Sequence, residues 1–114
     1  MKREIKDYII DIIDSMNKAI KFIEGMSYEQ FIQDDKTVFA VVRALEIIGE
    51  AIKKIPEEIR TRYPEIPWKG MAGMRNKVIH EYFGVNLKYI WATVKERIPE
   101  IKPMFEKILR DLES

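Results

Sequence analysis

The residues best suited to chemistry lie close together in the segment GMRNKVIHEY, positions 73–82. Arg75, Asn76, His80 and Tyr82 all fall within it, and His80 is the only histidine of the chain. Imidazole titrates near neutral pH and can serve as base or acid, while a guanidinium can hold a phosphate through two parallel hydrogen bonds. These groups suit cleavage of an RNA phosphodiester by its own 2′-hydroxyl, a reaction that needs a base, an acid and a nearby cation.

Helical spacing distributes these side chains over two faces. If the segment is a helix, Arg75 lies in its apolar stripe, whereas Asn76 and His80 lie on the other side, one turn apart and able to hydrogen-bond. Arg75 and His80 are then about 7.5 Å apart along the axis and roughly 140° apart around it. They can therefore converge more easily between two copies of the chain than within one. A twofold dimer would also supply a second histidine, so we expect a homodimer with a shared site.

An arginine in an apolar stripe needs a partner, because burying an unpaired guanidinium is costly. The preceding helical segment offers Arg43, Glu46 and Glu50, spaced so that they form one stripe. We expect Glu50 and Arg43 to support Arg75, and Asn76 to support His80. The alternative is that Arg43, Glu46 and Glu50 form ordinary surface ion pairs among themselves.

Spacing alone does not separate a catalytic His80 from a structural or surface histidine. Tyr82 alone is equally compatible with a packed ring whose hydroxyl lies at the rim of the core. Trp68 and Trp91 are interpreted as packing residues rather than as platforms for stacked bases.

Composition limits the class of protein. The chain has 114 residues, enough for one domain (1–114) with a modest core, and 46% of them are hydrophobic and 34% charged. Without cysteine and with one histidine, it offers no ordinary metal site, and we expect neither metal nor cofactor. No apolar run is long enough for a signal or membrane-spanning segment, so we expect a cytoplasmic protein with no membrane partner.

Charge is unevenly distributed along the chain. The formal net charge is only +1, which argues against a protein that coats nucleic acid through a large positive excess. Residues 53–77 nevertheless carry seven basic and three acidic side chains, whereas residues 1–35 carry five basic and eight acidic ones. A phosphate-bearing ligand is therefore expected near the middle of the chain.

Apolar residues recur three or four positions apart along most of the sequence, and no segment alternates like a strand. Gly25 and Pro56 mark helix ends, and Ser27 with Gln30 forms a capping box for a short helical turn. The pattern predicts an all-α, antiparallel helical bundle. Its expected helices cover residues 3–25, 36–55, 71–83, 86–97 and 99–112, with one further short helix possible at 57–63.

Two longer stretches resemble the HepT-like family, part of the HEPN-domain superfamily of small helical ribonucleases. They are RALEIIGEAIKKIP (43–56) and RYPEIPWKGMAGMRNKVIHEYFGV (62–85), and the similarity continues through NLKYIWATVKERIPEI (86–101) to the C-terminal helix. Their most specific element is Arg75, His80 and Tyr82, which match the R-x4-H-x-Y motif of that family. The resemblance implies a HEPN-like bundle.

The resemblance also implies roles for the motif residues. Arg75 and His80 correspond to the catalytic pair of a metal-independent endoribonuclease toxin, whose groove forms by dimerisation. Tyr82 corresponds to the tyrosine that receives AMP from a partner antitoxin, a minimal nucleotidyltransferase. An AMP group adds bulk and negative charge, which would occlude the groove and repel RNA.

Two other functions are compatible with the sequence. One is a non-catalytic helical subunit that binds nucleotide or substrate for a minimal nucleotidyltransferase. The other is a dimeric scaffold with no ligand. Retention of all three motif residues favours the enzyme.

Overall fold

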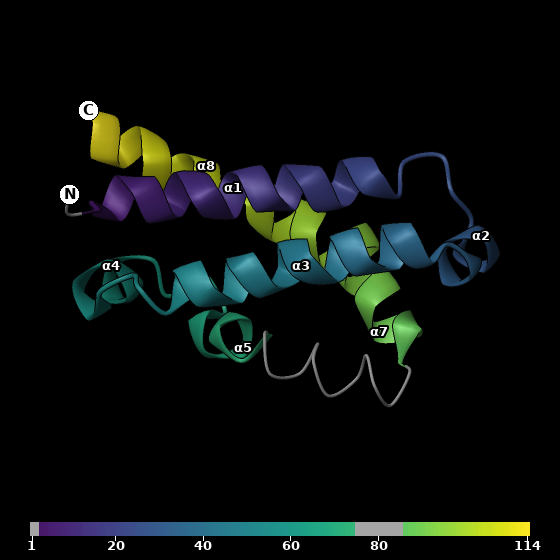
Figure 1. Ribbon diagram of the computed structural model, residues 1–114. Helices are drawn as coiled ribbons and strands as arrows, with labels where there is room; N and C mark the ends of the chain where they lie inside the picture. Colours follow the sequence, from purple (N-terminus) through teal and green to yellow (C-terminus); the bar gives the residue numbers. More distant parts are fainter. Residues whose placement is uncertain (1–2, 75–85) are drawn as a thin grey trace.

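The computed structural model describes residues 3–74 and 86–114, and every regular element in these ranges is a helix (Figure 1). The all-α class expected from the sequence is confirmed for this part of the chain. The elements are α1 (Ile5–Phe22), α2 (Tyr28–Gln33), α3 (Asp35–Ile52), α4 (Glu57–Arg62), α5 (Trp68–Ala72), α7 (Leu87–Ala92), a π-helical segment η1 (Thr93–Arg97) and α8 (Ile98–Glu113).

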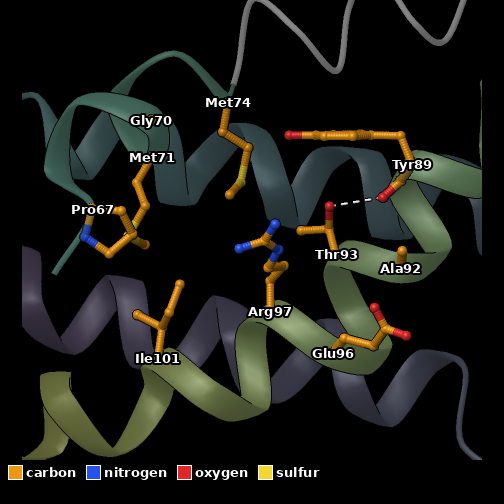
Figure 2. A pocket seen from close by; sticks show the side chains of 10 residues that line it. All are labelled: Pro67, Gly70, Met71, Met74, Tyr89, Ala92, Thr93, Glu96, Arg97 and Ile101. Carbon is orange, nitrogen blue, oxygen red and sulfur yellow. Dashed lines mark hydrogen bonds between the residues drawn. The ribbon is translucent and has the colours of Figure 1, made fainter.

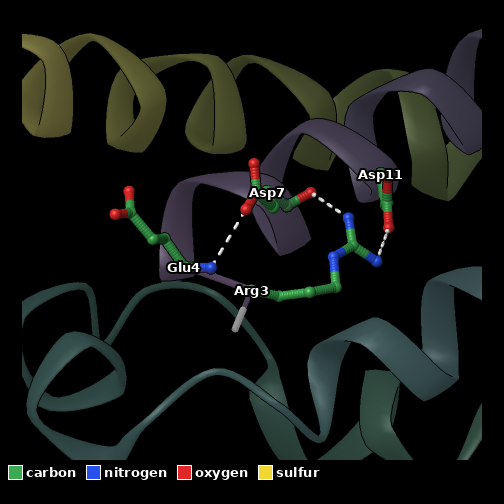
Figure 3. Close-up of polar contacts among 4 residues, drawn as sticks. All are labelled: Arg3, Glu4, Asp7 and Asp11. Atoms are coloured by element: carbon green, nitrogen blue, oxygen red, sulfur yellow. Dashed lines mark hydrogen bonds and ion pairs between the residues drawn. The ribbon is translucent and has the colours of Figure 1, made fainter. Parts of the chain in front are cut away.

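Polar side-chain contacts stabilise the start of α1, and a glycine turn follows its end. The backbone N–H of Glu4 donates to the Asp7 carboxylate at 3.0 Å, and Arg3 forms a 2.7 Å ion pair with Asp11, so both residues secure the first turns of α1 (Figure 3). After α1, Gly25 has a φ of +78°, a left-handed conformation that glycine adopts without steric cost. The chain can therefore reverse there and enter α2.

Polar caps at the starts of α2 and α7 follow the sequence expectation. The Ser27 hydroxyl accepts a hydrogen bond from the Gln30 backbone at 3.1 Å, and the Gln30 side chain accepts one from the Ser27 backbone at 2.8 Å. The Asn86 side chain accepts a hydrogen bond from the Tyr89 backbone at the start of α7. Each cap satisfies backbone donors that a helix start leaves unpaired.

The C-terminal end of α3 is stabilised from outside the helix. Arg60 of α4 donates to the carbonyls of Ile52 and Ile55 at 2.9 and 3.0 Å, so one guanidinium covers two carbonyls near the end of α3. A positive charge at the C-terminal end of a helix also interacts favourably with the partial negative charge of the helix dipole there. Helix α3 ends at Ile52, slightly before the expected boundary, and residues 53–55 form a turn.

Helix α1 runs antiparallel to both α3 and α8, and the two chain termini lie at the same end (Figure 1). An ion pair of 3.2 Å between Lys6 and Glu113 joins the start of α1 to the end of α8. Between the helices lies one core of buried apolar side chains. Its fully buried members include Ile9, Ile12, Met16, Phe31, Val41, Leu45, Ile48, Ile52, Ile90, Ile98, Phe105 and Ile108.

Both tryptophans pack against other rings, as the sequence analysis expects. Trp68 is buried edge-on against Phe105 with 5.5 Å between ring centroids, and its indole N–H donates to the Tyr63 carbonyl. Trp91 contacts the rings of Tyr28 and Phe31. These contacts fix α5 against α8, and α7 against α2.

Helix boundaries after Pro67 differ from expectation in two ways. A helix is expected to begin near Met71, but α5 already begins at Trp68 and ends at Ala72. The remainder of the helix expected over 71–83 lies largely outside the described residues. Helical structure from Leu87 to Glu113 is also uninterrupted, because η1 connects α7 directly to α8.

The π-helical segment accommodates the proline that follows it. In η1 the Ile98 N–H donates to the Thr93 carbonyl, five residues earlier, instead of to the carbonyl four residues earlier. Pro99 has no N–H, and its ring would crowd the Lys95 carbonyl in a regular α-helix. A wider turn before Pro99 relieves that crowding, so the chain stays helical where the sequence suggests a break.

Candidate functional site

Four of the predicted site residues lie outside the described part of the chain. Arg75, Asn76, His80 and Tyr82 belong to residues 75–85, between Met74 and Asn86. Their positions, and the convergence of Arg75 with His80, stay predictions.

The other two predicted site residues, Arg43 and Glu50, contact each other on α3. A distance of 3.6 Å separates Nη1 of Arg43 from Oε1 of Glu50, and their side chains are 60% and 46% exposed. This contact agrees with the alternative of a surface ion pair. A pair so exposed adds little to stability, on the order of 0–1 kcal/mol. Support of Arg75 by this pair is untested, since Arg75 lies outside the described residues.

Shallow surface depressions follow the seam between α1 and α3 beside this ion pair. Arg43 lines one of about 260 Å³ with Phe22 and Ile47, and Glu50 lines another of about 170 Å³ with Arg3. The pair therefore lies on the outer surface of the α1–α3 layer, where it is open to solvent.

A larger cavity of about 530 Å³ opens between α5 and the continuous helix formed by α7, η1 and α8 (Figure 2). Its walls are mainly apolar side chains, with a few polar groups from the continuous helix. The lining residues are Pro67, Gly70, Met71, Met74, Tyr89, Ala92, Thr93, Glu96, Arg97 and Ile101. Because Met74 is bonded directly to Arg75, one wall of this cavity leads along the chain into the motif.

Within the cavity, the polar groups have distinct orientations (Figure 2). The Arg97 guanidinium reaches the middle, toward Met74 and Thr93, whereas the Glu96 carboxylate points away. The Thr93 hydroxyl donates to the Tyr89 carbonyl at 2.7 Å, which leaves the cavity without a competing donor at that position. Arg97 is consequently the charged group that a bound molecule would meet there.

Arg97 and Tyr89 were not predicted as site residues from the sequence. Their only sequence signal is a four-residue spacing through Tyr89, Thr93, Arg97 and Ile101, which resembles an ordinary helix stripe. Nothing in that spacing indicates that α5 stands opposite to close a cavity.

Metal-binding clusters and membrane-spanning helices are both absent from the described ranges, 3–74 and 86–114. No three His, Cys, Asp or Glu side chains of these ranges gather in a way that could hold a metal ion. None of their helices is both long and apolar enough to cross a membrane.

Comparison with known proteins supplies the class. The model of a family described as "Ribonuclease HepT-like" matches residues 12–108. A protein of Methanocaldococcus jannaschii named "Putative RNase MJ1216" is 54% identical over 113 residues, covering 99% of this chain and 93% of that protein. "Probable ribonuclease HepT" of Thermococcus cleftensis is 52% identical over 108 residues, covering 95% and 98%.

These matches define a class of small helical ribonucleases. The chain belongs to the HepT-like ribonuclease family, which confirms the resemblance based on residues 43–56 and 62–85. No solved structure matches the chain.

Proposed function

We propose that the chain is a metal-independent endoribonuclease toxin that cuts RNA at a site shared by two protomers. The observation that carries this proposal is the motif of Arg75, His80 and Tyr82, which lies inside the residues matched by the ribonuclease family. The relatives from M. jannaschii and T. cleftensis are both named as ribonucleases, and each matches this chain over nearly its whole length.

The proposed reaction is an internal transesterification. The 2′-oxygen of a ribose attacks the adjacent phosphorus, and the bond from phosphorus to the 5′-oxygen of the next nucleotide breaks. A 2′,3′-cyclic phosphate and a free 5′-hydroxyl result. A base takes the proton of the 2′-hydroxyl, and an acid gives one to the departing 5′-oxygen.

His80 and Arg75 divide this work. Imidazole can act as the base or the acid, and two protomers supply two copies of His80 for the two proton transfers. The Arg75 guanidinium binds the phosphate and stabilises charge that builds on its oxygens. Asn76 holds His80 by a hydrogen bond, and the Arg43–Glu50 pair orients Arg75 from α3.

We assign control of the toxin to a minimal nucleotidyltransferase antitoxin that transfers AMP from ATP to Tyr82. The phenolic oxygen bonds to the α-phosphorus of ATP, the phenolic proton is lost, and pyrophosphate leaves. On a helix, Arg75 and Tyr82 share a face within about 20°. A phosphodiester on Tyr82 would place negative charge close to Arg75 and compete with the RNA phosphate for it.

Cleavage of a labelled single-stranded RNA in the presence of EDTA tests the proposal. Wild-type protein should cut, and Arg75→Ala and His80→Ala should each cut at least about a hundredfold more slowly, because each removes a group acting in the transition state. Arg110→Ala is the matched control. It removes an exposed positive charge on α8, outside the cavity lined by Arg97, and should cut at the wild-type rate.

Failure of the wild-type protein to cut any RNA, with its helical spectrum intact, would refute the enzyme. If the chain then bound a nucleotidyltransferase and raised its activity, the non-catalytic subunit would replace the toxin as the function. Loss of cutting on addition of EDTA would instead refute the metal-independent chemistry.

A further inference from the structure

Arg97 lies in the cavity between α5 and η1. Its guanidinium projects into the middle of the cavity (Figure 2), and no carboxylate of the described residues forms an ion pair with it. The side chain is exposed, so solvent and solutes can reach it. The cavity therefore offers an available positive charge surrounded mainly by apolar walls.

The π-helical turn helps to aim this charge. Residues four apart on a regular α-helix drift by about 40° per step, so Tyr89, Thr93, Arg97 and Ile101 would gradually turn away from one face. A turn closed by a hydrogen bond over five residues contains one more residue and reduces that drift between Thr93 and Arg97. As a result, all four line the same cavity.

The walls suit a flat, weakly polar body attached to an anion. The Tyr89 ring borders the cavity opposite Arg97 (Figure 2), and Met71, Met74 and Ile101 supply further apolar surface. Aromatic rings stack on nucleobases with little preference for sequence, and arginine is well shaped for phosphate. A volume of about 530 Å³ lies within the usual range of small-molecule sites.

We propose that this cavity binds one nucleotide of single-stranded RNA, with Arg97 on its phosphate and the base against Tyr89. The proposal deepens the proposed function, on which it rests for the identity of the substrate. It adds a substrate-binding subsite to the motif. Two residues that line this subsite flank the motif in the sequence, Met74 before it and Tyr89 after it. The subsite would hold the strand while the motif acts on it.

Binding of a fluorescein-labelled, single-stranded oligoribonucleotide, measured by anisotropy, tests the subsite. All variants are made in a His80→Ala background so that binding is observed without cutting. Arg97→Ala should weaken binding roughly tenfold, since it removes a charge-assisted contact. It should also reduce the steepness of the dependence of log K on log salt by about 0.7, the value for one phosphate contact on a single strand.

Three other variants sharpen the test. Arg110→Ala in the same background removes an equal charge from α8 outside the cavity and should leave affinity within about twofold, as expected for a distant exposed charge. Tyr89→Leu should weaken binding several-fold through lost stacking but leave the salt dependence unchanged. Arg97→Lys should give an intermediate affinity, because it retains charge but loses the paired hydrogen bonds.

Equal weakening by Arg97→Ala and Arg110→Ala would overturn the proposal, because only overall charge would then matter. Unchanged affinity in Arg97→Ala, or no RNA binding by the His80→Ala protein at all, would overturn it as well. Wild-type cutting together with unaltered binding in Arg97→Ala would remove the subsite but keep the ribonuclease. If RNA binding depends on Arg97 but the wild-type protein never cuts RNA, the subsite would be retained and the ribonuclease activity rejected.

Discussion

The Tyr63 hydroxyl donates a 2.5 Å hydrogen bond to the carboxylate of Asp111, joining the end of α4 to the last turns of α8. Tyr63 itself is buried, and its carbonyl accepts the indole N–H of Trp68. The bond from Tyr63 is the main reason that the pKa of Asp111 lies below its usual range. The same bond is the main cause of the raised pKa of Tyr63. The contact therefore links the stability of the bundle to pH.

Tyr63→Phe should lower the free energy of unfolding most between about pH 4 and pH 10, the range bounded by the ordinary pKa values of aspartate and tyrosine. Folding lowers the pKa of Asp111. The Asp111 carboxylate therefore stabilises the fold at pH values above its pKa in the unfolded state, and this stabilisation is lost as pH falls through its pKa in the folded state. Folding raises the pKa of Tyr63. The protonated Tyr63 hydroxyl therefore stabilises the fold at pH values below its pKa in the unfolded state, and this stabilisation is lost as pH rises through its pKa in the folded state. Urea unfolding of both proteins across pH measures this; a difference that stays constant from acid to alkali would contradict it.

Gly25→Ala should destabilise the fold by about 1 kcal/mol, because alanine resists the left-handed conformation. No atom lies within 4 Å of a Cβ built at Gly25, so the cost would come from the backbone and not from a clash. Gly70→Ala is the matched control, since its Cβ also meets nothing within 4 Å and Gly70 lies in α5 without a positive φ. Urea midpoints should fall for Gly25→Ala only; equal midpoints for both variants would exclude backbone strain as the cause.

Glu50→Gln should slow RNA cutting about tenfold or more while changing the unfolding free energy by less than about 1 kcal/mol. The first effect follows if Glu50 orients Arg75, and the second from the exposure of the Arg43–Glu50 pair. Cleavage rates and urea unfolding on the same preparation separate the two. Wild-type cutting by Glu50→Gln would reduce the pair to the surface contact that the structure shows.

Tyr82→Phe should keep its ribonuclease activity but escape covalent control by a nucleotidyltransferase partner. Phenylalanine retains the ring, and it lacks the oxygen to which AMP would be attached. Intact-protein mass spectrometry after incubation with the partner and ATP should show an added AMP on wild type and none on Tyr82→Phe. An AMP added equally to both proteins would assign the modification to another residue.

Short-range signals in the sequence correctly placed the starts of α2 and α7 and the turn at Gly25, although α1 itself spans Ile5–Phe22 rather than the expected 3–25. Ser27 with Gln30, Asn86 and Gly25 act through backbone groups only a few residues away, so their effects can be deduced without knowing the fold. The buried stripes of α1 and α3 were also predictable, because helical periodicity decides which side chains share a face. The family was evident from residues 43–56 and 62–85.

Contacts between distant parts of the chain could not be deduced in this way. Neither the Tyr63–Asp111 bond nor the placement of Arg97 opposite α5 has a local signature, since each depends on how helices far apart in sequence pack. The π-helical turn before Pro99 was missed because a proline there is equally compatible with a helix break. Sequence thus determined the all-α class, most of the helices and the family, through local hydrogen bonding, periodicity and the motif. Only the tertiary structure decided which side chains face one another, because packing brings together groups that the chain itself keeps apart.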